Sequence, residues 1–271
     1  MKTRLPAFAG HALGILYSLA LMLFLLLPLL TILPASLGSA ELIEFPPRQP
    51  TLAWYGEVLN DRDWLDSALL SLRIALGCAV LSTLLGGLSA LYAYRYRHLP
   101  RGLDSLFTLP LWMPQVILAS GLFSLLLPWD LLGSEVMLVL ANTALALPLS
   151  ALVLGGTFAR IDPSLWLAAS SLGARPLTIL RTLMLPLTAL GLFTSVLLAF
   201  HSAWDETVFA LFIGPLETPT LTSRLYAYLA QSVTPAVAAV ASLLVFATLL
   251  IALATMLLRR RSATAPHWLH S

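Results

Sequence analysis

Apolar residues in this chain form blocks long enough to cross a lipid bilayer. A helix needs about 20 consecutive apolar residues to span the hydrocarbon, and long runs occupy Leu13–Leu33, Ala68–Tyr92, Leu106–Leu127, Val136–Phe158 and Pro235–Leu258. A further run, Leu187–Ile213, qualifies apart from His201, Asp205 and Glu206. Since 59% of residues are hydrophobic and 10% are charged, the composition is not that of a water-soluble globular domain. We predict an all-α membrane protein whose residues 1–271 form a single transmembrane domain of six helices.

Basic residues are distributed unequally between the two sides that six helices would define. One side holds Arg48, Arg62 and Arg224, and the other holds Lys2, Arg4, Arg95, Arg97, Arg101, Arg160, Arg175, Arg181, Arg259, Arg260 and Arg261. Short loops rich in lysine and arginine stay in the cytoplasm, so both termini are expected there. Residues 34–66 then form the first outer segment, and residues 162–186 form a cytoplasmic loop.

Three local features add detail to this topology. Arg73, inside the second run, is interpreted as a side chain that reaches the outer interface, with a functional role as the alternative. Pro110 and Pro114 are expected to kink or delay the third helix, because proline lacks a backbone donor. After the break at Gly214-Pro215, residues 221–232 are expected to form a short amphipathic outer helix.

Residues 162–186 carry signals for two short helices joined at an angle. Asp162 followed by Pro163 supplies a capping side chain and a proline at the first helical position. Gly173 can adopt the left-handed conformation that ends a helix, and a proline three residues later can begin the next. The first helix, residues 163–172, has no charged residue although it faces the cytoplasm. Such a surface is typical of a partner interface, and the alternative is a helix that lies on the lipid.

The same loop carries a motif: Leu167-Ala168-Ala169, then Gly173, then Leu183-Met184-Leu185-Pro186. This motif resembles the "EAA…G…I.LP" loop of the permease subunits of binding-protein-dependent ABC importers. The stretches RIDPSLWLAASSLGA and WDETVFALFIGP also resemble the spermidine/putrescine-type subgroup. One departure is Leu167, which stands where the family has a glutamate. An ion pair through that side chain therefore cannot form.

The resemblance implies a fold and a set of partners. The fold would be the MetI-like transmembrane fold, in the bacterial inner membrane, with residues 34–66 as the first periplasmic segment. The importer would also contain a second homologous permease, expected to be a different chain, together with two ATP-binding subunits and a periplasmic substrate-binding protein. The complex would lie in membrane lipid, and no nucleic acid is expected as a partner. Helix 163–172 would be the coupling helix of the loop 162–186. The residues implied at the ATPase contact are Asp162, Pro163, Leu165, Trp166, Leu167, Ala168, Ala169, Gly173, Ala174 and Pro186.

Trp204, Asp205 and Glu206 occur together near the end of the run that begins at Leu187. Carboxylates and an aromatic face suit a cationic amine, so we interpret these residues as the outer part of a translocation path. The alternative is that both acids are solvated residues at the membrane edge. A polyamine or a similar small amine is the favoured solute, and amino acids, phosphonate, thiamine, sulfate and ferric ion are the alternatives carried by related importers.

The sequence argues against an enzyme. It has no G-x-x-x-x-G-K-[ST] phosphate loop, so ATP and magnesium are expected to bind partner subunits and this chain to hold no cofactor or metal. An enzyme that used His201 with Asp205 or Glu206 would be expected to carry an H-E-x-x-H motif or a nucleophile motif, and the sequence has neither. An ion-driven transporter should show matched halves with broken helices, which we do not find. A transport subunit without catalytic activity is the prediction.

Overall fold

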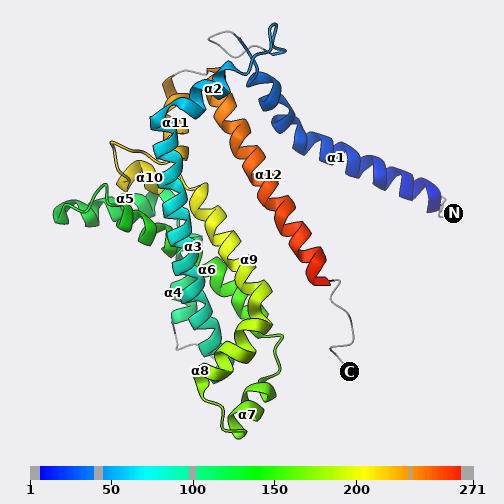
Figure 1. Cartoon of the computed structure of the whole chain (residues 1–271), viewed down its shortest axis with the longest axis vertical. Helices are drawn as coiled ribbons and strands as arrows, with labels where there is room; N and C mark the ends of the chain where they lie inside the picture. The colour runs from blue at the N-terminus through cyan, green and yellow to red at the C-terminus, as the bar shows by residue number, and fades with distance from the viewer. Residues whose placement is uncertain (1–6, 40–44, 98–101, 232–233, 264–271) are drawn as a thin grey trace, which may run out of the picture. The chain divides into compact units, whose positions relative to one another are not determined.

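The computed structural model describes residues 7–39, 45–97, 102–231 and 234–263, and the regular elements in these ranges are helices (Figure 1). Two compact units are formed, one by residues 1–62 with 227–271 and the other by residues 63–226. Lys2, Arg4 and Arg101, which contribute to the predicted topology, lie outside the described residues.

Three long helices form the core of the larger unit: α3 (Arg62–Tyr96), α6 (Glu135–Phe158) and α9 (Leu185–Trp204). They approach closely at small residues. A Cβ atom on Gly86 of α3 would lie 2.8 Å from Cβ of Ser150 on α6, and one on Gly191 of α9 would lie 2.7 Å from Cγ2 of Thr157 on α6. Small interfacial residues are what helices need to pack within lipid, where no hydrophobic force drives them together.

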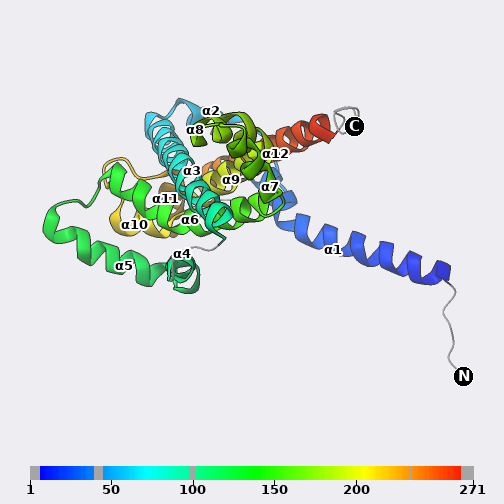
Figure 2. The same cartoon turned by 90° about the horizontal axis from the view of Figure 1, so that it is seen from below.

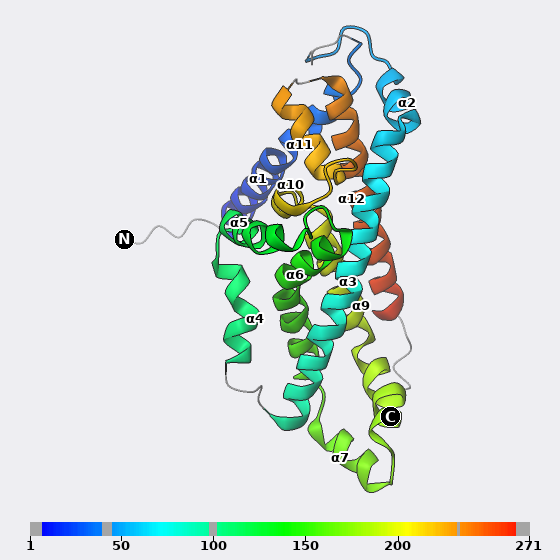
Figure 3. The same cartoon turned by 90° about the vertical axis from the view of Figure 1, so that its left-hand side faces the viewer.

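Short helices lie at the two ends of this bundle. At one end are α7 (Pro163–Ser171) and α8 (Pro176–Ile179), and toward the other are α10 (Val208–Ile213) and the start of α11 (Leu221–Gln231) (Figures 1 and 3). The helix α8 continues through a π-helical segment, Leu180–Met184, directly into α9. The predicted short helix at residues 221–232 is present as α11.

The third apolar run, the predicted span Leu106–Leu127, is not one continuous helix, and it breaks before Pro114, one of the two prolines expected to kink or delay it. It forms α4 (Leu103–Trp112) and α5 (Gln115–Leu126), which run in different directions (Figures 2 and 3). The break has a local cause: Met113 precedes a proline, which disfavours helical backbone, and it is extended with φ −94° and ψ 137°. Pro110 is accommodated inside α4. The chain then continues through a short 3-10 turn, η1 (Leu127–Trp129).

Four helical stretches within the described residues are long and apolar enough to cross a membrane: Gly14–Ala35, Arg62–Tyr96, Glu135–Phe158 and Pro176–Trp204. The apolar helices Gln115–Trp129 and Pro235–Leu250 are shorter. The run Leu187–Ile213 is interrupted, because α9 ends at Trp204 and α10 begins at Val208. The chain is thus an all-helical membrane protein, and the count of six spans stays a prediction.

The smaller unit contains α1 (Ala7–Ala35), α2 (Ala53–Asn60) and α12 (Pro235–Ala263). The Tyr55 hydroxyl lies 2.7 Å from Oγ of Ser36 and 2.6 Å from Oγ of Ser242, so one side chain joins all three segments. The indole Nε1 of Trp54 donates to the carbonyl of Gly38 at 2.9 Å. Hydrogen bonds therefore order part of the predicted outer segment 34–66, of which residues 40–44 lie outside the described ranges.

Candidate coupling and translocation sites

The helix α7 begins where the sequence predicts. The carboxylate of Asp162 accepts a hydrogen bond from the backbone N–H of Ser164 at 2.8 Å, and Pro163 occupies the first helical position. Accepting hydrogen bonds from Ser164 lowers the pKa of the Asp162 carboxyl, and the positive charge of Arg97 lowers it further. The cap is therefore ionised at neutral pH and holds a free backbone donor at the start of the helix.

The end of α7 is a left-handed glycine cap. Gly173 has φ +79°, its N–H donates to the carbonyl of Ser170 at 3.0 Å, and the N–H of Ala174 donates to the carbonyl of Ala169 at 3.1 Å. This pair of bonds is the Schellman arrangement that terminates helices. No atom lies within 4 Å of where a Cβ on Gly173 would sit, so the requirement for glycine arises from backbone conformation.

One face of α7 is buried against other helices of the larger unit. Trp166 is 9% exposed and belongs to a cluster with Ala90, Leu154, Phe158, Ile179 and Met184. Ala169 and Ala174 pack against the same cluster. Trp166, Ala169 and Ala174 of the predicted contact set therefore face inward and anchor α7.

The open side of α7 is uncharged, and its exposed side chains are leucines, an alanine and serines. Leu165 is 40% exposed, Leu167 is 59% exposed, and Leu172, just after the helix, is 89% exposed. Ala168 is also exposed. Pro186 lies apart from this face, exposed in the first turn of α9. The predicted contact residues are therefore divided between an anchor, an open face and the next helix.

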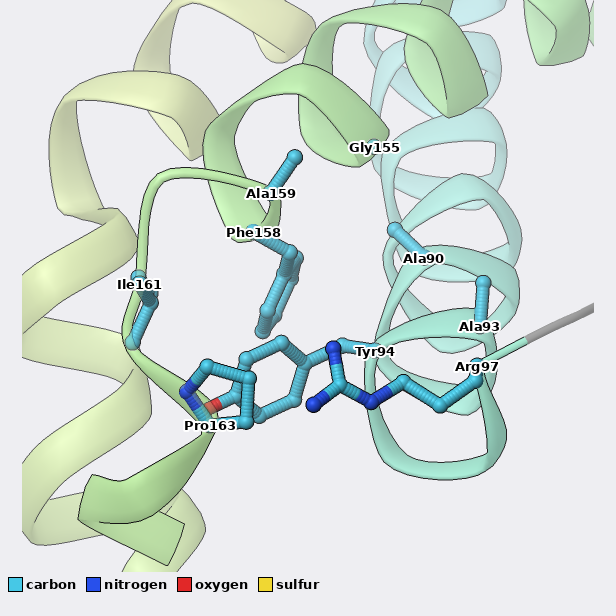
Figure 4. Close-up of a pocket in the computed structure, with 9 residues that line it drawn as sticks. All are labelled: Ala90, Ala93, Tyr94, Arg97, Gly155, Phe158, Ala159, Ile161 and Pro163. Atoms are coloured by element: carbon cyan, nitrogen blue, oxygen red, sulfur yellow. The ribbon is translucent and has the colours of Figure 1, made fainter.

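The end of α3 holds α7 in place through contacts that the sequence analysis did not predict. The Tyr94 hydroxyl donates to the backbone carbonyl of Asp162 at 3.1 Å, and the Tyr94 and Phe158 ring centroids are 5.7 Å apart. The guanidinium carbon of Arg95 lies 5.9 Å from the centroid of the Trp166 ring. Figure 4 shows Tyr94, Phe158, Pro163 and Arg97 around a pocket of about 320 Å³.

A signal for these contacts was available in the sequence. The second apolar run is followed by two alternating tyrosine–arginine pairs, Tyr94-Arg95 and Tyr96-Arg97. Side chains with an apolar body and a polar or charged tip suit the end of a span, and here they also contact the neighbouring loop.

The three predicted path residues have different surroundings. Trp204 is half-buried and stacks on Phe200 with ring centroids 5.7 Å apart. Asp205 caps the end of α9 with its side chain exposed. Glu206 is 8% exposed, and its carboxylate accepts from the backbone N–H groups of Phe209 at 2.8 Å and Ala210 at 3.3 Å. Glu206 thus caps the start of α10, which leaves Asp205 as the open carboxylate.

Ion pairs connect elements near the same end of the bundle. Arg73 is paired with Glu135 at 2.9 Å and joins α3 to α6, so this intramembrane arginine has a protein partner as well as an exposed position. Arg224 of α11 lies 3.4 Å from the Asp63 carboxylate and donates to Oγ of Ser67 at 2.8 Å. Within the described residues, no group of three or more His, Cys, Asp and Glu side chains could hold a metal ion.

Comparison with known proteins identifies the family. Residues 82–263 match the family described as binding-protein-dependent transport system inner membrane component. The chain belongs to this family. This permease is therefore a multi-pass transport subunit of the inner membrane without a catalytic role, and its membership implies a substrate-binding protein and an ATPase as partners.

Individual relatives of the permease have different solutes in their names. It is 30% identical over 215 residues to the spermidine/putrescine transport system permease protein PotC of Escherichia coli K12, covering 78% of this chain and 80% of that protein. It is 34% identical over 210 residues to the sulfoquinovosyl glycerol transport system permease protein SmoH of Agrobacterium fabrum C58, covering 75% and 74%.

A solved structure supports the fold. The permease superimposes with a TM-score of 0.70 on a chain of a bacterial ABC transporter involved in the import of the acidic polysaccharide alginate, at 20% sequence identity. The match covers 94% of this chain and 99% of that one. The permease therefore has the transmembrane fold of an ABC importer.

Proposed function

We propose that this permease is one of two different permease chains of an ABC importer and that α7 couples it to ATP hydrolysis. The observation that carries the proposal is the division of α7 into a buried anchor at Trp166 and an uncharged open face at Leu165, Leu167 and Leu172. An exposed apolar face on a firmly held helix is suited to insertion into a partner. The partner is an ATP-binding subunit, because the chain has no phosphate loop of its own.

The proposed topology has six spans with both termini in the cytoplasm. The arginine asymmetry supports this orientation, since Arg95, Arg97, Arg160, Arg175 and Arg181 all lie around the α7 end of the larger unit. In this topology the broken pair α4 and α5 serves as the third span, residues 34–66 form the first periplasmic segment, and the periplasmic binding protein delivers solute at the end that carries Asp205.

For the solute we propose a polyamine or a related small organic amine. Asp205 supports a cationic solute because it is an exposed carboxylate beside Trp204, whose ring can receive an ammonium group. The name of the relative PotC points to the same class. Glu206 contributes by capping α10, and Trp204 and Asp205 are the side chains that we propose for the path.

A second candidate is a sugar glycoside, favoured by the 34% identity to SmoH. The two candidates predict different ligands for the cognate binding protein, which delivers the solute. The test is a binding screen of that protein with putrescine, spermidine and sulfoquinovosyl glycerol, followed by uptake of the bound compound into proteoliposomes that contain the assembled importer and ATP. Binding and uptake of an amine support the proposal, and selective binding of the glycoside refutes it.

A further inference from the structure

A small basic pocket opens beside the exposed face of α7. Tyr94, Arg95 and Arg97 from the end of α3 and Pro163, Trp166 and Leu167 from the start of α7 line about 80 Å³. Leu167 belongs both to the pocket lining and to the open face of the helix. The pocket is therefore continuous with the surface proposed to dock the ATP-binding subunit.

The positive charge at this place comes entirely from α3. From Pro163 to Ser171 the helix α7 has no ionisable side chain, and Leu167 cannot form an ion pair. Arg95 is held over the rings of Trp166 and Tyr96, with its guanidinium carbon 5.9 Å and 5.8 Å from their centroids.

Arg97 is placed by its backbone. It directly follows α3 with φ 68°, a left-handed conformation in which the helix cannot continue. Figure 4 shows its guanidinium beside the Tyr94 ring and toward Pro163. The pocket of about 320 Å³ in that view shares Tyr94, Arg97 and Pro163 with the smaller one. Arg97 therefore stands at the boundary of both hollows.

In the part of the chain that the structure describes, no acidic side chain pairs with either of the two arginines, Arg95 and Arg97. Among the described side chains, a nearby carboxylate is that of Asp162, which feels the charge of Arg97 but accepts a hydrogen bond from the N–H of Ser164 at 2.8 Å. The guanidinium groups of Arg95 and Arg97 carry two positive charges and the carboxylate of Asp162 carries one negative charge, so these groups together have a net positive charge.

We propose that an acidic side chain of the ATP-binding subunit enters the pocket beside Leu167 and binds Arg97, with Arg95 at its side, when α7 docks. The pocket admits the tip of a single side chain, and guanidinium groups bind carboxylates through two parallel hydrogen bonds. Charge at the interface is thus supplied by Arg95 and Arg97, next to an α7 that contributes only uncharged side chains. This inference rests on the proposed coupling function and names the chemistry of the partner surface.

The competing occupant is an anionic lipid headgroup, since basic and aromatic residues at the end of a span also attract the inner leaflet. The observations favour the ATP-binding subunit, because the pocket is walled by Leu167 of the docking face and by the first residue of α7. A lipid occupant would leave the assembly of the importer independent of Arg97.

The test compares Arg97→Glu with Arg160→Glu in the whole importer, expressed with its own ATP-binding subunits and second permease. Arg160 is also exposed at this end of the bundle and lines neither pocket, so it controls for net charge. The measurement is the fraction of ATP-binding subunit retained on the purified permease as sodium chloride is raised. We expect Arg97→Glu to lower retention at least about fivefold and Arg160→Glu to lower it less than about twofold.

A second arm identifies the partner group. Each exposed Asp or Glu of the ATP-binding subunit near its permease contact is changed to Lys, and one such change should restore retention to Arg97→Glu. Retention unaffected by Arg97→Glu, with loss of copurified phosphatidylglycerol, would assign the pocket to lipid and overturn the proposal. Equal losses in the Arg97 and Arg160 variants would also overturn it, because net charge would then explain the effect.

A third arm separates this proposal from the proposed function. In a Leu167→Cys permease, a thiol crosslinker should join α7 to the ATP-binding subunit. If crosslinking occurs while Arg97→Glu has no effect, the docking of α7 stands and the acidic contact is refuted. If no crosslink forms at Leu167, the proposed coupling site itself fails, and the pocket proposal fails with it.

Discussion

The two adjacent acids after α9 are expected to respond differently to loss of charge. Glu206→Gln keeps the shape of the side chain but replaces one acceptor oxygen by an NH₂ donor. If the remaining oxygen keeps the N–H of Phe209, at 2.8 Å, the new donor faces the N–H of Ala210, at 3.3 Å. Glu206 is buried, so water cannot easily replace the lost acceptor.

The size of the effect follows from these two bonds. Hydrogen bonds to charged groups contribute about 1.5–3 kcal/mol and neutral ones about 0.5–1.5 kcal/mol, so removing the charge costs about 1 kcal/mol at Phe209. An unsatisfied buried donor adds about 1–3 kcal/mol, and the lower value applies at Ala210 because that bond is long. The sum is about 2 kcal/mol, which corresponds to a melting temperature lower by about 4–8 °C for a domain of this size.

The assay is thermal unfolding of the purified permease in detergent, with solute uptake measured in parallel. Asp205→Asn should keep the parental melting temperature, because Asp205 is exposed, and should sharply reduce uptake of a cationic solute. Glu217→Gln, at another exposed acid, is the control and should change neither property. An unchanged melting temperature in Glu206→Gln would refute the capping assignment. Parental uptake by Asp205→Asn would make Asp205 a solvated edge residue.

Three further predictions concern α7 and the topology. Gly173→Ala should strain the left-handed cap by about 1 kcal/mol without a clash, so transport should fall while the membrane-inserted level stays normal. Gly173→Asn should lose less transport activity. Equal transport by the parent and both variants would show that the left-handed cap is not needed. Trp166→Ala should destabilise the anchor by about 3–5 kcal/mol and make α7 accessible to protease, whereas a protease pattern identical to the parent would refute the anchoring role. A single cysteine that replaces Glu57 should be labelled from outside, and single cysteines that replace Arg97, Arg175 or Arg260 should be protected. Labelling at position 175 from outside would reverse the topology.

Local backbone signals were sufficient to predict α7 and its ends. An aspartate before a proline begins a helix through its own side chain, and Gly173 ends it because φ +79° is nearly free of cost for glycine. Neither effect depends on the rest of the fold. The same reasoning placed α11 after the Gly214-Pro215 break.

Features that depend on tertiary contacts were not predicted. The helix α7 has no charged residue on any side, so the sequence could not tell that Trp166 faces inward while Leu167 faces outward. Glu206 looked like a path residue because its hydrogen-bond donors, the backbone N–H groups of Phe209 and Ala210, become available only when α9 ends at Trp204. The break in the third apolar run was predicted in part, because Pro110 and Pro114 were expected to kink or delay this helix. The structure breaks the helix at Met113, before Pro114, and accommodates Pro110 inside α4.

The π-helical segment between α8 and α9 controls the rotation of α9 about its own axis. Ile179 and Met184 are both buried in the cluster around Trp166, yet residues five apart on an α-helix point about 140° away from each other. The segment Leu180–Met184 absorbs one extra residue, so that both side chains face the anchor of α7. The number of residues in this segment therefore matters more than the identity of its exposed ones, such as Thr182. Deleting Thr182 would turn every side chain of α9 by about 100° relative to α7, so a different set of α9 residues would face α6.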